Sequence, residues 1–296
     1  MDKIINVEND HGIRIDQFLT QYLGGTSRSR VQSLIGREKV CVNAKIVKKH
    51  YLLRPGDRIE LGEMESAAPS HLLPVSMPLD ILYEDKFLIA VNKPPFLSVH
   101  PGAGPPVPTL VHGLLAYTEN LASNGCRPGI VHRLDKETSG ILLIAKDDTT
   151  LHMLSSAFQN RKVHKTYLAV THSTPPEGTF THLLTRDPKC RTRYTVSTSE
   201  GKEAISTFIV LCKTGSVSLV QIEPATGRTH QIRVQLSHLK APVYGDKLYS
   251  KMKVPPRHML HATRLNLIHP ITQMPLELSA PIPADFAAVL KRENLR

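Results

Sequence analysis

The sequence predicts an α+β protein in which a small basic module precedes a long domain built on a mostly antiparallel sheet. Three observations lead to this prediction. The first sixty residues show the apolar spacing of two short helices, followed by short strand-like runs. From residue 78 onward, short apolar runs dominate and helical segments interrupt them at four places. The length of 296 residues accommodates one large domain and one small one.

The front module, residues 13–62, begins with a helix. Apolar residues between positions 15 and 23 recur at i, i+3, i+4, i+7 and i+8, which places them on one face. Two glycines end this helix, and Thr26 or Ser27 caps a second helix that runs to about residue 36. Short strands are predicted at residues 40–42, 46–47 and 58–61, the last of them after a strong turn.

One side of this module is basic. The second helix carries Arg28, Arg30 and Arg37, and Lys48 and Lys49 follow the second strand. The planar fork of arginine offers two donors to a phosphate group, so this side is typical of an RNA-binding module. The alternative is a solvated helix face that is basic without a partner, and the arginine spacing alone does not exclude it.

Residues 63–77 have no periodicity and contain Ala, Ser and Pro, which predicts a linker before a second domain at 78–296. In this domain, strands are predicted at residues 79–83, 87–91, 141–145, 165–171, 204–211, 217–223, 261–268 and 276–279. Helices are predicted at residues 109–118, 149–160, 230–239 and 284–293.

Composition and charge exclude several classes of protein. No run of eighteen apolar residues is present and the N-terminus lacks a signal-peptide core, so we expect a cytoplasmic protein without a membrane partner. Four well-separated cysteines form no C-x-x-C pair, which argues against a zinc site or a disulfide framework. The net charge of +11 indicates a polyanionic partner. Charge for solubility, or for an anionic membrane, is the alternative.

The segment GIVHRLDKETSGILLIAKD, residues 129–147, sets a polar cluster between two apolar runs. Asp135 in this cluster needs a cationic partner or must stay protonated, because an unpaired buried carboxylate is costly. Its sequence neighbours on a loop point in other directions. Arg233 is a better candidate, since it lies beside the apolar seam of a predicted helix. The alternative is a surface arginine whose stem covers apolar side chains.

Two further segments are candidates for the same site. Tyr167 lies in a predicted strand between cations and apolar residues, where its ring can stack on a base. A core tyrosine with a satisfied hydroxyl group is the alternative. The segment NKPPFLSVHPG, residues 92–102, is a loop rich in Pro and Gly that is suited to lining a cleft.

These segments resemble a known family. The runs HRLDKETSGILLIAK, KTYLAV, TGRTHQIRVQLSHL, PVYGDKLY and LHATRLNLIHP stand in the order found in RluA-type pseudouridine synthases, and the front module resembles the alpha-L RNA-binding domain. The resemblance implies a pseudouridine synthase catalytic domain behind that module.

The resemblance also implies roles for individual residues. Asp135 matches the catalytic aspartate, Arg233 the basic residue paired with it, and Tyr167 the tyrosine that stacks on the uracil and has been considered as a general base. Arg133 matches the arginine that fills the gap left by the extruded uridine, Arg228 joins the RNA-binding residues, and Leu260 and Leu265 pack around the base.

The implied protein is a monomeric isomerase that acts on RNA, most closely on large-subunit ribosomal RNA, and needs no cofactor and no metal. The aspartate either attacks the sugar C1′, removes a proton from C2′, or attacks uracil C6. A synthase acting on transfer RNA and a non-catalytic RNA-binding ribosome-assembly factor are the alternatives. A nucleoside hydrolase would need a second carboxylate or a metal cluster near Asp135, and apart from Glu137 none is apparent.

Overall fold

The computed structural model describes residues 3–7, 12–23, 28–62, 72–102, 107–123, 127–190, 192–250 and 255–295. The chain folds into two compact units, Met1–His71 (the front unit) and Leu72–Arg296 (the large unit). Of the linker predicted at 63–77, residues 63–71 lie outside the described part. Residues 72–77 belong to the large unit, because Val75 N–H donates to the His112 carbonyl and Met77 packs at Gly113.

The front unit packs two helices on a small sheet. Its elements are β1 (Lys3–Asn6), α1 (Ile15–Tyr22), α2 (Arg28–Gly36), β2 (Val40–Val42), β3 (Lys45–Ile46) and β4 (Arg58–Leu61). The strands are antiparallel in the order β1-β4-β2-β3. A fully buried Asp16 on α1 binds Arg14 and, through Gln32 Nε2 (2.7 Å), fastens α2 to α1. The apolar faces predicted for both helices form the core.

The large unit is built on one mixed sheet. Its elements are β5 (Ile81–Glu84), β6 (Leu88–Lys93), α3 (Leu110–Tyr117), β7 (Ser139–Ala145), α4 (Asp148–Gln159), β8 (His164–His172), β9 (Gly178–Arg186), β10 (Tyr194–Ser197), β11 (Lys202–Thr214), β12 (Val217–Pro224), α5 (Gln231–His238), β13 (Leu260–Ile268), β14 (Pro275–Ser279) and α6 (Ala284–Arg292). Within the described ranges the strand order is β10-β9-β11-β12-β8-β13-β7-β6-β5, with β14 paired to β13. Only β13 and β7 run parallel there. The predicted α+β class is confirmed.

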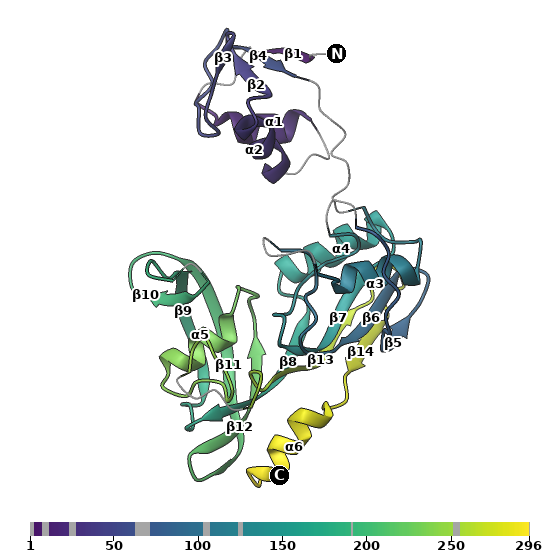
Figure 1. Ribbon diagram of the computed structural model, residues 1–296, viewed down its shortest axis with the longest axis vertical. Helices are drawn as coiled ribbons and strands as arrows, with labels where there is room; N and C mark the ends of the chain where they lie inside the picture. Colours follow the sequence, from purple (N-terminus) through teal and green to yellow (C-terminus); the bar gives the residue numbers. More distant parts are fainter. Residues whose placement is uncertain are drawn as a thin grey trace. The chain divides into compact units, whose positions relative to one another are not determined.

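Helices cover this sheet in two groups (Figure 1). β5, β6 and β7 carry α3 and α4, whereas β9 to β12 carry α5, and β8 and β13 join the two halves. On β7, Leu142 and Ile144 pack in the cluster that contains α3, while Ile141 and Leu143 pack in the cluster that contains α4. A strand buried on both faces reads as a continuous apolar run, which is why the sequence indicated β7 clearly.

Three strands were absent from the sequence prediction. β1 has four residues and pairs with β4, more than fifty positions away. β9 and β10 lie at one edge of the large sheet, and their side chains are mostly half-buried or exposed, so neither shows the apolar alternation that marks a strand. No helix in the described residues has both the length and the apolar character needed to cross a bilayer.

The first residues of β7 show where the sheet tolerates no side chain. Gly140 has φ +111, and an added Cβ would meet the backbone of Ala262 on β13, the strand paired with it in parallel. We therefore expect Gly140→Ala to lower the free energy of unfolding of the large unit by about 3 kcal/mol. Gly102→Ala, where nothing lies within 4 Å, is the control. Equal urea midpoints for the two variants would contradict this reading.

Candidate active site

The loop that precedes β7, residues 131–138, carries Asp135 and is fixed to the sheet by His132. His132 Nε2 accepts a hydrogen bond from Leu143 N–H (2.9 Å), and its ring stacks on Phe158 of α4 (centroids 4.6 Å apart). Burial and, to a smaller extent, the charge of Lys165 lower the pKa of His132 to about 3. The imidazole is therefore neutral at neutral pH and serves as an anchor of the loop.

Buried polar side chains hold the rest of the loop. Thr138 Oγ1 shares a hydrogen bond with His258 Nε2 (2.7 Å), and Ser139 Oγ shares one with His261 Nδ1 (3.0 Å). Arg257, fully buried, donates to the Glu137 carbonyl (3.2 Å). Together these groups fix the backbone on the C-terminal side of Asp135, which leaves little freedom in where its carboxylate points.

Arg257 also links this loop to the C-terminal helix. Its Nε and Nη2 donate to the two carboxylate oxygens of Asp285 at 2.6 and 2.9 Å, and Asp285 lies in the first turn of α6. A bidentate pair of this kind is a strong, directional contact. The position of the loop therefore depends on residues far along the chain.

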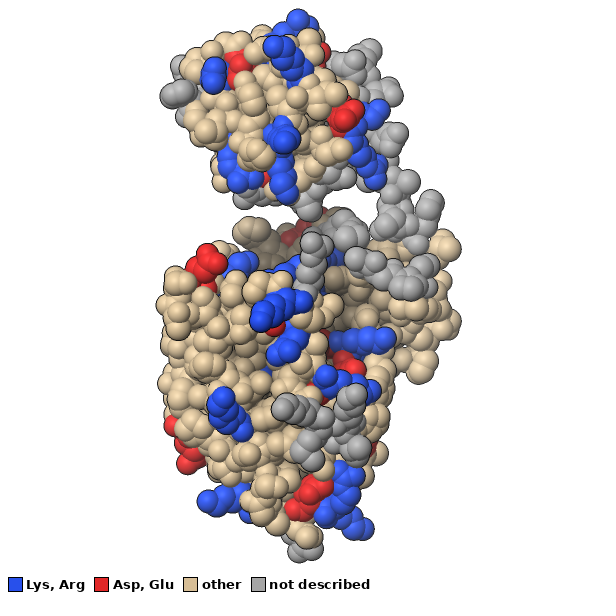
Figure 2. Space-filling view, turned by 60° about the vertical axis from the view of Figure 1, so that its left-hand side comes forward, with Lys and Arg blue, Asp and Glu red and all other residues tan. Residues whose placement is uncertain are grey.

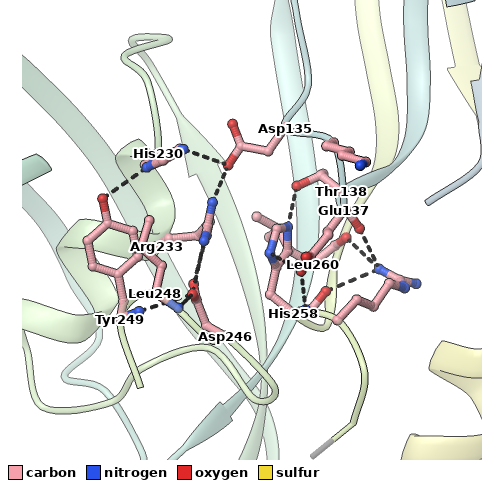
Figure 3. Close-up of polar contacts among 12 residues, drawn as sticks. Asp135, Glu137, Thr138, His230, Arg233, Asp246, Leu248, Tyr249, His258 and Leu260 are labelled. Carbon is pink, nitrogen blue, oxygen red and sulfur yellow. Dashed lines mark hydrogen bonds and ion pairs between the residues drawn. The ribbon is translucent and has the colours of Figure 1, made fainter. Parts of the chain in front are cut away.

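Arg233 of α5 holds two carboxylates at once (Figure 3). Its Nη1 donates to Asp135 Oδ2 at 2.8 Å, while Nε and Nη2 donate to the two oxygens of Asp246 at 2.7 and 2.9 Å. Asp246 is fully buried and also accepts backbone N–H bonds from Leu248 and Tyr249. Asp246 thus orients the guanidinium group so that an Nη1 N–H is aimed at Asp135.

This arrangement keeps Asp135 ionised. Burial alone would raise the pKa of its carboxyl group, but positive charge at His230 and Arg233 and the hydrogen bond from Arg233 outweigh it and leave the pKa below the ordinary value. The permanent charge is that of Arg233, because burial lowers the pKa of His230 despite the attraction of Asp135. The side chain of Asp135 retains 19% exposure, so the carboxylate is charged and reachable.

His230 stands beside Asp135 in a strained conformation. It precedes α5 with φ +56, and its Nε2 lies 3.9 Å from Asp135 Oδ2. Tyr194 N–H donates to the Tyr249 hydroxyl oxygen, and that hydroxyl lies 2.9 Å from His230 Nδ1. If the Tyr249 hydroxyl donates to Nδ1, a neutral His230 carries its proton on Nε2, toward the aspartate. Strain of this kind gathers at functional sites.

These groups open onto a pocket of about 430 Å³. Six of the residues expected from the sequence line it: Asp135, Arg133, Tyr167, Arg228, Arg233 and Leu260. The volume lies in the range of small-molecule sites, and a few polar groups converge on a partly apolar wall, as such sites require. Across the described ranges, no group of three or more His, Cys, Asp and Glu side chains is arranged to hold a metal ion.

Tyr167 comes from β8, opposite Ala262 of β13 and Ile222 of β12. Burial raises the pKa of its hydroxyl group, and the charge of Asp135 raises it further. A phenol in this setting stays protonated at neutral pH. It can donate a hydrogen bond and offer its ring for stacking, but it is a poor base in the free enzyme.

Some predicted site residues lie elsewhere. Leu265 does not line the pocket, and it packs in the hydrophobic cluster that contains Leu143 and Leu154. The register of β13 pairs Ala262 with Tyr167 and, after a shift, Leu265 with Lys165, so Leu265 stays on the face that carries Tyr167 but lies farther along the strand. The cluster also includes Val131 and Phe158, which do line the pocket. Leu265 therefore lies behind the pocket wall.

The basic residues predicted to bind RNA at positions 28–49 belong to the front unit, whereas the pocket belongs to the large unit. Arg37, Lys48 and Lys49 are exposed in the front unit, and the side chains of Arg28 and Arg30 lie outside the described part. In the face drawn in Figure 2, Lys and Arg are spread over both units and predominate over Asp and Glu. This distribution fits the net charge of +11.

Sequence reasoning missed three residues of the site. Asp246 lies in the turn after α5, in the quoted run PVYGDKLY, and nothing in that run distinguishes a buried ion-pair partner from a turn aspartate. His230 gives no signal apart from its place before α5. Lys165 lines the pocket on the strand that carries Tyr167, and burial lowers its pKa to about 8. The alternation of β8, which puts residues 165 and 167 on one face, was the available signal.

Comparisons with known proteins identify the family. The family model described as RNA pseudouridylate synthase matches residues 87–238, and the S4 domain model matches residues 13–59. An uncharacterized RNA pseudouridine synthase of Bacillus subtilis, YlyB, is 40% identical over 295 residues, which covers 98% of this chain and 96% of the relative. Ribosomal large subunit pseudouridine synthase D of Escherichia coli K12 is 35% identical over 306 residues, with coverage of 96% and 91%.

Solved structures agree with the sequence relatives. The human RNA pseudouridylate synthase domain containing 4 aligns with a TM-score of 0.60 at 28% identity, over 73% of this chain and 94% of that one. The chain therefore belongs to the RNA pseudouridylate synthase family. It is an isomerase that converts uridine in RNA to pseudouridine, and its front unit is an S4 domain. The resemblance to RluA-type synthases is confirmed.

The ion pairs of Arg233 with Asp135 and Asp246 give a prediction about stability. Asp246→Asn puts an amide NH₂ against the Arg233 donors in a fully buried position, so we expect the free energy of unfolding to fall by about 3 kcal/mol. Asp135→Asn should change it by less than about 1 kcal/mol, since that side chain is partly exposed and its amide oxygen can still accept from Arg233. Urea unfolding of both variants tests the difference. Equal losses would show that the two carboxylates share the ion pair equally.

Proposed function

We propose that this synthase modifies uridines in large-subunit ribosomal RNA and that Asp135 is its catalytic carboxylate. The observation that carries the second part is the state of Asp135, which is ionised, 19% exposed and hydrogen-bonded to Arg233 at the wall of a pocket of about 430 Å³. A group that acts as a base or a nucleophile must be deprotonated and within reach of substrate. Asp135 meets both conditions.

The reaction asks little else of the protein. The bond between C1′ and N1 breaks, the uracil turns, and a bond forms between C1′ and C5. The proton displaced from C5 is balanced by one gained at N1, so the product is an isomer of the substrate. An ionised Asp135 suits attack on C1′, which forms an ester that the turned base displaces, and it suits removal of a proton from C2′ equally well.

The other pocket residues divide the remaining work. Tyr167, held protonated, offers its ring to the uracil. Leu260 adds apolar surface to the pocket wall. Arg133 is exposed at the pocket, where it can fill the space that the extruded nucleotide leaves in the RNA. Arg233 acts through Asp135, because three of its N–H groups are donated to Asp135 and Asp246.

Base extrusion has to be offset by binding. Unstacking a nucleotide costs a few kcal/mol, and contacts with phosphates can supply that free energy. Arg228 at the pocket and the exposed Arg37, Lys48 and Lys49 of the front unit are suited to such contacts. Arg28 and Arg30 join this proposal on their sequence positions alone.

The ribosomal target rests on relatives. The Escherichia coli protein that is 35% identical over most of both chains is named for the ribosomal large subunit. The S4 domain is an RNA-binding module whose presence favours a large structured RNA. We also place the reaction in the cytoplasm, because bacteria such as Escherichia coli assemble their ribosomes there.

Asp135→Asn tests the catalytic assignment. The amide is neither a base nor a nucleophile, so the variant should bind a transcript of large-subunit ribosomal RNA within about two-fold of the wild-type affinity and form no pseudouridine, a loss of at least about 10⁴-fold in rate. Filter binding and pseudouridine mapping on the same transcript are the measurements.

The control is Glu277→Gln, which removes a carboxylate from an exposed position on β14. It should leave both readouts unchanged. Normal turnover by the Asp135 variant would remove this residue from the catalytic role while leaving the family assignment intact.

The target is tested in cells. Deleting the gene should remove pseudouridines from large-subunit ribosomal RNA, and the intact gene should restore them, whereas the Asp135→Asn gene should not. Loss confined to transfer RNA sites would overturn the ribosomal assignment. Mapping across total RNA separates the two outcomes in one experiment.

A further inference from the structure

Phe96, in the loop that follows β6, combines two unusual properties. Its backbone has φ +65, the left-handed region that bulky side chains rarely adopt, and the side chain is 50% exposed. A large apolar residue in that conformation costs about 1–2 kcal/mol relative to an ordinary backbone geometry. Burial of the ring would offset this cost, but the residue is left half exposed.

The backbone on both sides of Phe96 is held in place. Lys93, fully buried, donates from Nζ to the carbonyls of Pro94 (2.7 Å) and Leu97 (3.0 Å), so the turn wraps around its ammonium group. The next two carbonyls, of Ser98 and Val99, accept from the first N–H groups of α3. The ring is therefore presented to solvent by a rigid turn.

This turn lies against the Asp135 loop. Lys93 Nζ also donates to the carbonyl of Lys136 (3.2 Å), the residue after Asp135. The register of β6 and β7 pairs Lys93 with Gly140, so both loops leave the sheet at the same end. His100, in the same loop as Phe96, has its pKa lowered by burial and also by the charges of Arg127 and Arg133.

The surroundings of Phe96 are cationic. Residues 92–102 contain no Asp or Glu. Arg127 and Arg133, both exposed, act on His100 of the same loop, and the exposed Lys136 belongs to the turn that Lys93 contacts. A rigid, exposed aromatic ring among cations is the arrangement that binds unpaired nucleotides, because the ring stacks on a base and the cations pair with phosphates. A protein partner that covered Phe96 with an apolar surface would also have to cover these charged side chains.

We propose that Phe96 stacks on an unpaired base of the substrate RNA, next to the nucleotide that enters the pocket. This inference requires that the substrate is RNA, but it depends neither on the role of Asp135 nor on the ribosomal target. Phe96 is a binding residue, and the chemistry in the pocket does not involve it.

A tryptophan reporter tests the contact directly. The chain has no tryptophan, so Phe96→Trp introduces a single fluorophore. Stacking on a base quenches indole emission, and we expect a single-stranded oligouridine to quench it. Polyphosphate, which offers negative charge without bases, should leave the emission unchanged. Leu211→Trp, at an apolar position of similar exposure (48%) on β11, should not respond to either probe.

A glycine variant separates binding from packing. Phe96→Gly removes the ring and relieves the left-handed backbone, so the melting temperature should stay the same or rise. The Kd for oligouridine should rise about five-fold or more, as loss of one base–aromatic stack implies. Leu211→Ala should leave this Kd unchanged.

Three results would overturn the inference: an unchanged Kd for Phe96→Gly, an unquenched Phe96→Trp, or a lower melting temperature for Phe96→Gly, which would mean that the ring packs within the protein. Each is distinguishable from failure of the proposed function, because the binding probe requires no turnover and ribosomal RNA is absent from the assay.

Discussion

The site depends on one guanidinium group shared by two carboxylates. Arg233 gives two of its donors to a fully buried Asp246 and one to Asp135, so one positive charge faces two negative ones. Asp246 is the orienting partner, since it is closed to solvent and further held by backbone N–H groups. Asp135 receives enough positive charge to stay ionised and keeps part of its surface free. A fully neutralising partner would stabilise the carboxylate more and leave it less reactive.

The surroundings of this ion pair are unusually polar for a protein interior. Lys93, Arg257, His258 and His261 are all buried, and each makes at least one hydrogen bond to the loop that carries Asp135 or to Ser139, the first residue of β7. Such groups are expensive to bury unless their partners are present, so they accept few alternative geometries. They hold the Asp135 loop in one position, as the proposed catalytic role of Asp135 requires.

Much of this could be predicted from the sequence, and the gaps have physical causes. Doubly buried strands such as β7 and amphipathic helices such as α1 leave strong apolar patterns, whereas the mostly half-buried or exposed strands β9 and β10 leave none. The pairing of Asp135 with Arg233 followed from the need of a carboxylate for a cation. Asp246 and His230 were missed because their roles arise from a turn and a left-handed residue around α5. Leu265 does not line the pocket because it lies farther along β13 than Leu260, in the cluster that contains Leu143 and Leu154.

The strand order has a consequence for synthesis of the protein. β13 lies between β7 and β8, although about ninety residues or more separate it from both in the sequence, and it supplies Leu260 to the pocket. Until this strand inserts, the two halves of the sheet have no common edge, and the groups that they carry cannot meet. A nascent chain on the ribosome therefore lacks the complete site until β13 has emerged. Long-range pairing of this kind is slow to form. The protein therefore becomes able to modify RNA late in folding and in a single step.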